Sequence, residues 1–157
     1  MKKHLLFLLI IMFYGCTESN LAFHPRLNPS NGTLELVQAF GGSKNDVAKS
    51  VVSTADGGFA VLGYTQSLDG DITDKATDDY DFWMLKFNSE AQLEWNKTYG
   101  GSGDDRGSSL IETSDGGYAL LGYSDSSDGD VSSNNGNRDF WLVKINASGV
   151  LSWEKSF

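Results

Sequence analysis

The chain has 157 residues, with 21 acidic and 12 basic side chains and a formal net charge of −9. This length accommodates one domain with a modest core, and an apolar fraction of 39% excludes a simply disordered chain. The acidic balance argues against a surface that binds nucleic acid. A single cysteine excludes an internal disulfide framework and a four-cysteine zinc site.

Residues 1–15 have the pattern of a signal peptide, because two lysines precede an apolar run at 5–14. A helix of that length rises about 15 Å, half the hydrocarbon core of a bilayer, which argues against a spanning anchor. The lone cysteine, Cys16, follows a glycine, and residues 13–16 resemble the lipobox of bacterial lipoproteins. The resemblance implies that Cys16 is lipidated and attaches the mature chain to a membrane. An ordinary cleaved signal and an uncleaved anchor are the alternatives.

A polar segment follows the cysteine. Residues 17–32 contain both prolines and show no hydrophobic periodicity, which is typical of a tether between an anchor and a folded body. We therefore expect four parts in this chain: a signal peptide at 1–15, the lipidated cysteine and polar tether at 16–32, an extra strand with a first repeat unit at 33–99, and a second unit at 100–157.

The body of the chain is an internal repeat. Three segments return 59 positions later, namely 40–43 at 99–102, 56–64 at 115–123 and 69–71 at 128–130. Past the long polar loop the offset becomes 58, so that Asp81-Phe82-Trp83 returns as Asp139-Phe140-Trp141. A one-residue insertion or deletion in the loop accounts for the change of offset.

Each unit is predicted to form four short strands, because apolar runs with strand-like composition are separated by Asp-Gly and Asn-Ser turn signals. The predicted strands are 47–53 with its counterpart 107–113, 59–64, 81–87 with 139–145, and 93–99 with 151–157. No helical period is present after the signal segment, so the body is predicted to be all-β. Four antiparallel strands per repeat of this length are typical of a β-propeller blade.

The units resemble the propeller repeats of bacterial surface lipoproteins and secreted proteins of the Bacteroidota. The resemblance is carried by DGGYALLGY at 115–123, DGD at 128–130, DFWLVKI at 139–145 and LSWEKSF at 151–157. The segment 144–153 is also similar to the tryptophan-docking turn of quinoprotein-like propellers, with no quinone cofactor implied. These resemblances imply β-propeller architecture and say little about activity.

We expect two complete blades plus one extra N-terminal strand at 34–40, an incomplete propeller. Typical propellers have four to eight blades, so a fragment of a longer propeller is the favoured interpretation. A ring built from several chains and an open two-blade structure are the alternatives. A folded two-blade unit would expose a sheet face at each end, which would permit self-association.

The repeat body has no histidine and no cysteine, which excludes Ser-His-Asp and Cys-His catalysis and the usual zinc sites. We therefore expect a chain that is not an enzyme and has no cofactor. Oxygen-rich loops can hold calcium, and the candidate ligands are Asp69, Asp71, Asp128 and Asp130. The alternative is that these carboxylates make turns and caps.

Repeated aromatic residues favour a packing role between blades over a carbohydrate-stacking face, because a unique binding site would need residues that do not repeat. This set comprises Trp83, Trp95, Trp141, Trp153, Phe82 and Phe140. Non-repeated loop residues are better candidates for binding a protein or a carbohydrate. They include Arg106, Asn135 and Arg138.

The favoured hypothesis is a non-enzymatic exported lipoprotein of the cell envelope, at the outer membrane or cell surface, whose propeller repeats form a binding or scaffold module. One alternative is a carbohydrate-active hydrolase with its catalytic residues in missing blades. Another is a truncated remnant without independent function. A secreted or periplasmic location is the alternative to membrane attachment, and the ligand is left open.

Overall fold

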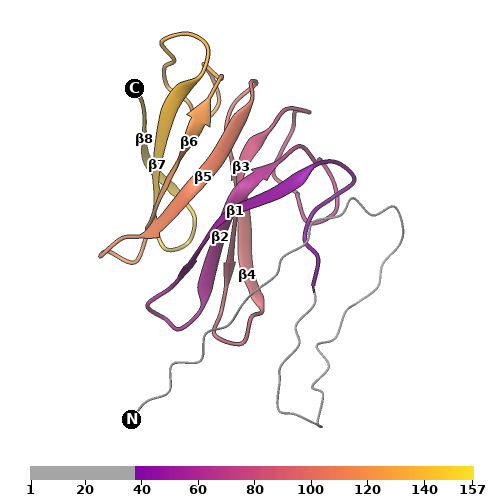
Figure 1. Cartoon of the computed structure of the whole chain (residues 1–157), viewed down its shortest axis with the longest axis vertical. Coiled ribbons are helices and arrows are strands. Elements are labelled where there is room, and N and C mark those ends of the chain that lie inside the picture. Colours follow the sequence, from indigo (N-terminus) through magenta and orange to yellow (C-terminus); the bar gives the residue numbers. More distant parts are fainter. Residues whose placement is uncertain (1–37) are drawn as a thin grey trace.

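The computed structural model describes residues 38–157, which form two four-stranded antiparallel sheets (Figure 1). The first sheet has the order β1-β2-β3-β4 and the second the order β5-β6-β7-β8. The strands are β1 (Asp46–Ser53), β2 (Phe59–Thr65), β3 (Asp81–Phe87), β4 (Leu93–Tyr99), β5 (Asp105–Glu112), β6 (Tyr118–Ser124), β7 (Asp139–Ile145) and β8 (Leu151–Ser156). The predicted all-β class with two blade-like sheets is confirmed.

Most predicted strand boundaries agree with the structure. β3, β4 and β7 coincide with the predicted ranges, whereas β1 and β5 begin one and two residues earlier, at Asp46 and Asp105. The predicted extra strand at 34–40 falls mostly outside the described residues, and its described part, 38–40, is not in a strand. The predicted signal peptide, lipidation site and tether also lie outside the described residues. Within residues 38–157 no helix has the length and apolar character needed to cross a membrane.

The β1–β2 hairpin closes through a turn that requires glycine. Gly57 has a φ of 86°, a left-handed value that side chains with a Cβ rarely adopt. Asp56 Oδ1 accepts hydrogen bonds from Thr54 Oγ1 at 2.5 Å and from Gly58 N at 2.9 Å. The second unit repeats this turn around Asp115. The Asp-Gly-Gly sequence therefore forms the same hairpin turn in both sheets.

The two sheets share their irregularities as well as their strand order. The β1–β2 register shifts between Ala48 and Ser50, and the β5–β6 register shifts between Gly107 and Ser109. A further shift occurs near the end of β3, and its counterpart lies near the end of β7. Because bulges bend and twist a strand, identical bulges give the two sheets matching curvature, which allows one sheet to pack on the next.

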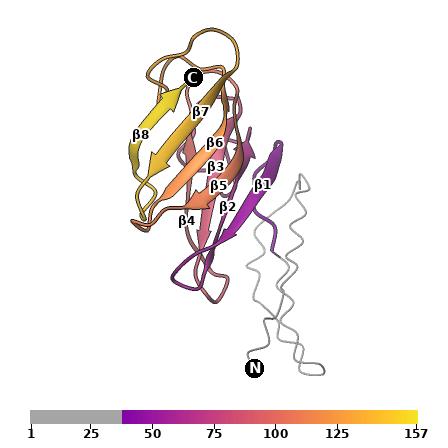
Figure 2. The same cartoon turned by 60° about the vertical axis from the view of Figure 1, so that its left-hand side comes forward.

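The sheets pack face to face around a shared apolar core, with β5–β8 lying across β1–β4 (Figure 2). The ring of Phe82 in β3 meets Trp141 in β7 edge to face, with centroids 4.8 Å apart. Core residues of the first sheet are Ala60, Leu62, Phe82, Met84 and Tyr99, and those of the second unit are Leu110, Tyr118, Leu120, Val131, Trp141, Val143 and Ile145.

Hydrogen bonds also connect the two sheets across the interface between them, which we call the joint. Asp105 N at the start of β5 donates to Tyr80 O at 2.5 Å, and Tyr99 Oη donates to Gly149 O at 2.7 Å. At the opposite end of β5, Glu112 accepts a hydrogen bond from Ala55 N at 2.9 Å. Apolar burial supplies most of the association between the sheets, while these bonds define its register.

Candidate functional site

The repeated Asp-Gly-Asp loops bind the Gly-Gly-Ser segment of their own unit. Asp69 Oδ1 accepts a hydrogen bond from Ser43 N at 2.7 Å, and Asp71 Oδ2 accepts one from Gly41 N at 2.9 Å. In the second unit Asp128 Oδ1 accepts from Ser102 N at 2.7 Å, and Asp130 Oδ2 accepts from Gly100 N at 3.2 Å. The carboxylates thus clamp the segment that enters each sheet.

These four aspartates are the candidate calcium ligands, and in each of them one carboxylate oxygen accepts a hydrogen bond from a backbone amide. The amide of Ser43 holds the pKa of Asp69 below its ordinary value, whereas burial raises the pKa of Asp130. Among residues 38–157 no group of three or more His, Cys, Asp or Glu side chains is arranged to hold a metal ion. The geometry matches the turn-and-cap alternative, and a calcium titration distinguishes it from calcium binding.

Asp46 and Asp105, the first residues of β1 and β5, are buried anchors for the same segments. Asp46 accepts hydrogen bonds from Gly42 N at 2.8 Å and Ser67 Oγ at 3.0 Å, and also from the Thr65 hydroxyl. Asp105 accepts from Gly101 N at 2.8 Å and from Ser126 Oγ at 2.7 Å. Both aspartates therefore hold the segment that precedes their strand.

A buried charged cluster lies at the joint between the sheets. The Lys75 side chain is 0% exposed and pairs with Asp81 Oδ2 at 3.1 Å and with Asp79. Oδ1 of Asp81 and Oδ1 of Asp105 are buried without a hydrogen-bond partner among the described residues. Both side chains converge on Gly100, where an added Cβ would meet each carboxylate.

The environment of this cluster favours a protonated carboxyl group. Burial raises the pKa of Asp81 to about 7, an effect that Lys75 opposes and that the charges of Asp79 and Asp105 reinforce. Burial also raises the pKa of Asp105. The sequence analysis did not predict this cluster, although Lys75 lies in a loop segment, 75–80, that the second unit does not repeat. The signal available was one lysine within a strongly acidic loop.

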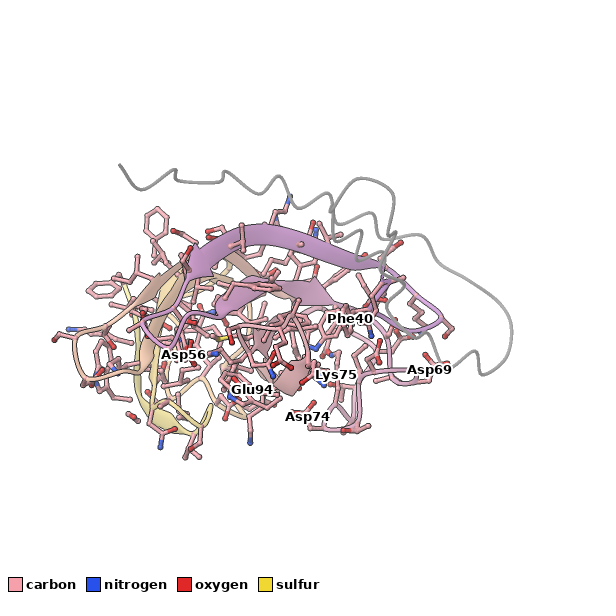
Figure 3. All side chains as sticks on the ribbon, turned by 90° about the horizontal axis from the view of Figure 1, so that it is seen from below. Phe40, Asp56, Asp69, Asp74, Lys75 and Glu94 are labelled. Atoms are coloured by element: carbon pink, nitrogen blue, oxygen red, sulfur yellow. The ribbon has the colours of Figure 1, made fainter. Side chains whose placement is uncertain are left out.

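A second lysine is enclosed at the other end of the first sheet. Lys86 in β3 is 4% exposed, and its Nζ donates to Asp56 Oδ2 at 2.7 Å, Glu94 Oε2 at 2.8 Å and Phe87 O at 2.8 Å. Burial lowers the pKa of Lys86, but the bonds to the two carboxylates outweigh it and the net shift is upward. Figure 3 shows Asp56 and Glu94 near each other and Asp69 well apart from them.

Lys144 repeats this arrangement in reduced form. Its Nζ contacts Asp115 Oδ2 at 3.0 Å and Ile145 O at 2.9 Å. Ser152 stands at the place of Glu94, so one of the two carboxylates is missing. Hydrogen bonds from Thr113 and Lys144 hold the pKa of Asp115 well below its ordinary value. Both lysines fix strand ends to the Asp-Gly-Gly turns.

Arg106 lies in β5 and contacts the preceding sheet. Its guanidinium is 4.0 Å from the Tyr80 ring centroid and 5.2 Å from that of Tyr64, within the range of cation–π attraction. Arg106 Nη2 also bonds to Asp104 Oδ2 at 2.9 Å. The side chain therefore spans the joint between the sheets and does not stand free in a loop.

The other two candidate binding residues lie on the exposed loop before β7. Arg138 lies 4.7 Å from the Tyr123 ring centroid, and its Nε is 3.5 Å from Asp125 Oδ2. Asn135 N donates to Asp139 Oδ2 at 2.5 Å. Both side chains are exposed. Of the three predicted binding residues, these two are accessible, whereas Arg106 is half-buried between the two sheets. Cys16 lies outside the described residues.

The repeated aromatic residues divide into two groups. Phe82, Trp83 and Trp141 are buried as predicted, and Trp95 is half-buried and packs against the core. Phe140 and Trp153, by contrast, are 71% and 50% exposed, so the packing between blades that was predicted for them is not formed among the described residues. The reason is that their face of β5–β8 has no sheet packed on it among residues 38–157.

No protein-family model and no curated protein matches this chain.

Proposed function

We propose that this chain is a non-enzymatic exported lipoprotein whose propeller-type repeats form a binding or scaffold module at the cell envelope. The observation that supports it best is the use made of the repeated carboxylates. In both units they bind backbone amides of the Gly-Gly segments or a strand lysine. The repeated acidic groups therefore stabilise the fold of each unit. Specific binding is assigned to the exposed non-repeated loop with Asn135 and Arg138.

Membrane attachment through Cys16 is tested by metabolic labelling with a palmitate analogue in a bacterial host, followed by membrane fractionation. We expect the chain to be labelled and to sediment with membranes, and Cys16→Ala to be unlabelled and released. Thr17→Ala is the matched control, because it leaves the cysteine in place. Equal labelling of the Cys16→Ala variant would contradict lipidation at this residue.

The binding role is tested with the soluble body of the chain on a glycan array and on immobilised envelope proteins. Arg138→Ala is expected to weaken binding to whichever glycan or protein the unsubstituted chain binds, because it removes an exposed cation. Lys97→Ala removes a cation from β4 and serves as the control. The hydrolase alternative predicts instead that the protein cleaves chromogenic glycosides, and turnover there would overturn the non-enzymatic assignment.

A further inference from the structure

Two buried aspartates meet across the joint between the sheets. Asp81 begins β3 of the first sheet, and Asp105 begins β5 of the second. They are 6% and 0% exposed. A Cβ added to Gly100 would collide with Asp81 Oδ1 and would lie 2.6 Å from Asp105 Oδ2, so the two carboxyl groups border the same small space. The packing of the sheets therefore holds two acidic groups close together and away from water.

Hydrogen bonding of this pair is incomplete. Asp105 Oδ2 accepts hydrogen bonds from Gly101 N at 2.8 Å and from Ser126 Oγ at 2.7 Å. Asp81 Oδ2 pairs with Lys75 Nζ at 3.1 Å. The other oxygen of each carboxyl group, Oδ1, is buried and has no partner among residues 38–157. Because a buried polar atom without a hydrogen bond costs free energy, the space between the sheets lacks a donor.

The charges around Asp81 do not balance. Asp81 faces Lys75 and Asp79 of the loop that precedes β3. It also lies in the field of Asp105 in β5, and the uncharged Thr65 stands opposite it in β2. Lys75 divides its charge between Asp79 and Asp81. If all the carboxyl groups of this cluster were ionised, one lysine would face three buried or partly buried carboxylates, and burial makes such an excess of charge costly.

The other groups near the pair do not supply the missing positive charge. Arg106, the next residue of β5, forms its ion pair with the aspartate that precedes the strand. The hydroxyl groups of Ser124 and Ser126 favour the charged form of Asp105, but burial outweighs them and raises its pKa. Tyr99, the last residue of β4, is neutral because burial raises its pKa. Among these groups, a proton on one of the two aspartates is what lowers the negative charge.

The equivalent aspartates that do not meet show what the contact changes. Asp46 is the counterpart of Asp105, and Asp139 is the counterpart of Asp81. Both oxygens of Asp46 accept hydrogen bonds, and Asp139 Oδ2 accepts one from a backbone amide at 2.5 Å. Neither residue has a buried oxygen without a partner within the part of the chain that the structure describes. The incomplete hydrogen bonding therefore arises where the two aspartates meet.

We propose that Asp81 and Asp105 share one proton that holds the joint closed, and that release of this proton at higher pH loosens the contact between the two sheets. Protonated Oδ1 of Asp81 is the missing donor, and the carboxylate of Asp105 is its acceptor. Two carboxyl groups this close do not both ionise readily, so they share a proton as acid and carboxylate. The proposal rests on the contacts at the joint and is independent of the proposed export and envelope role.

The direction of the effect follows from the pKa of Asp81. In the closed joint burial raises this pKa from its ordinary value of 3.8 to about 7, against the opposing effect of Lys75. In an open joint, water restores a value near the ordinary one. The closed joint is therefore favoured fully below a pH of about 3.8, and this advantage is lost as the pH rises through about 7. For one proton, the equilibrium constant for opening rises by up to about tenfold per pH unit between these limits.

Carbon-13 NMR of the aspartate carboxyl groups tests the shared proton. We expect Asp81 to titrate near pH 7 and Asp105→Asn to lower that midpoint by about one pH unit or more, because groups that share a proton are coupled at least this strongly. Asp139→Asn is the matched control, since it changes the counterpart of Asp81 away from the joint, and it should leave the midpoint in place. A midpoint of Asp81 near 3.8, or one that Asp105→Asn does not lower, would refute the shared proton.

Hydrogen exchange of the Asp105 amide tests the loosening, because this amide donates to Tyr80 O across the joint at 2.5 Å. After correction for the intrinsic exchange rate, its protection should fall as the pH rises from about 5 to about 7. Asp81→Asn should abolish this trend, since the amide side chain does not ionise, whereas Asp139→Asn should retain it. Asp105 should also be less protected than Leu62 in the central strand β2, because the joint opens while the sheet stays folded.

Three results would overturn the proposal: protection of Asp105 that does not fall with pH, a trend that persists in Asp81→Asn, or equal protection of Asp105 and Leu62. If Asp81→Asn does not fold, the titration of Asp81 in the unsubstituted chain and in Asp105→Asn still decides whether the proton is shared.

Discussion

Phe82 and Phe140 occupy the same place in two successive units, yet the structure gives them opposite environments. Phe82 is fully buried and meets Trp141 edge to face, with centroids 4.8 Å apart. Phe140 is mostly exposed. We therefore predict that truncation to alanine at these two positions has very different effects on the free energy of unfolding, although the residue type, strand and flanking sequence are the same.

The expected magnitudes follow from burial. Removing a fully buried phenylalanine costs about 3–5 kcal/mol, because it loses both transfer free energy and packing. The contact between Phe82 and Trp141 contributes about 0.5–1.5 kcal/mol beyond its area. Less than a third of Phe140 is covered, so Phe140→Ala should cost about 1 kcal/mol or less. For a small domain with about 5–15 kcal/mol of stability, Phe82→Ala removes a large fraction of the total.

Urea denaturation followed by tryptophan fluorescence measures both values, with m-values compared to verify that the same cooperative unit unfolds. A difference of at least about 2 kcal/mol between the variants is expected from these burial arguments. Equal losses at the two positions would refute the packing of β5–β8 on the Phe82 side of the first sheet. A double variant with Trp141→Ala adds a control, since the loss at Phe82 should shrink once its partner is gone.

Three further predictions concern the polar groups. Burial raises the pKa of Asp81 from its ordinary value of 3.8 to about 7. At intermediate pH the folded chain therefore retains a proton that the unfolded chain has released. The resulting contribution to stability is complete below a pH of about 3.8 and is lost as the pH rises through about 7. Asp81→Asn should therefore flatten the pH dependence of the urea midpoint between acidic and neutral pH, and an unchanged profile would count against it. Lys86→Met should destabilise by about 1–3 kcal/mol and more than Lys144→Met, because Lys86 has two carboxylate partners; the reverse order in urea melts would contradict this. Millimolar calcium should leave the melting temperature unchanged, since the loop carboxylates are bound to amides, and a clear upward shift would instead establish the calcium site.

The parts of the fold that the sequence predicts well are those that depend on a single sheet. The Asp-Gly-Gly turn around Asp56 and the strand starting at Asp81 are set by local turn chemistry and strand alternation, and the repeat doubles each signal. Aspartate capping in the Asp-Gly-Asp loops was likewise available as an alternative from turn preferences alone.

The features that escaped prediction all depend on what lies against a sheet. The burial of Lys75 requires the second sheet to approach the loop that carries it, and the stacking of Arg106 on Tyr80 joins residues of different units. Burial of Phe140 was inferred from its repetition, but repetition reports only that each unit offers the same face. Whether that face is covered depends on the neighbouring layer, which no position within the unit encodes.

The acidic and glycine-rich composition has one physical source in these repeats. A Cβ on Gly42 would collide with Asp69, and a Cβ on Gly101 would collide with Asp128, so each clamp needs a carboxylate and a glycine together. The carboxylate binds amides at a distance that leaves no room for a side chain. Every added unit therefore brings both residue types in fixed proportion. The clamp carboxylates therefore contribute to the net charge of −9 for a structural reason, and substrate steering is not needed to explain them.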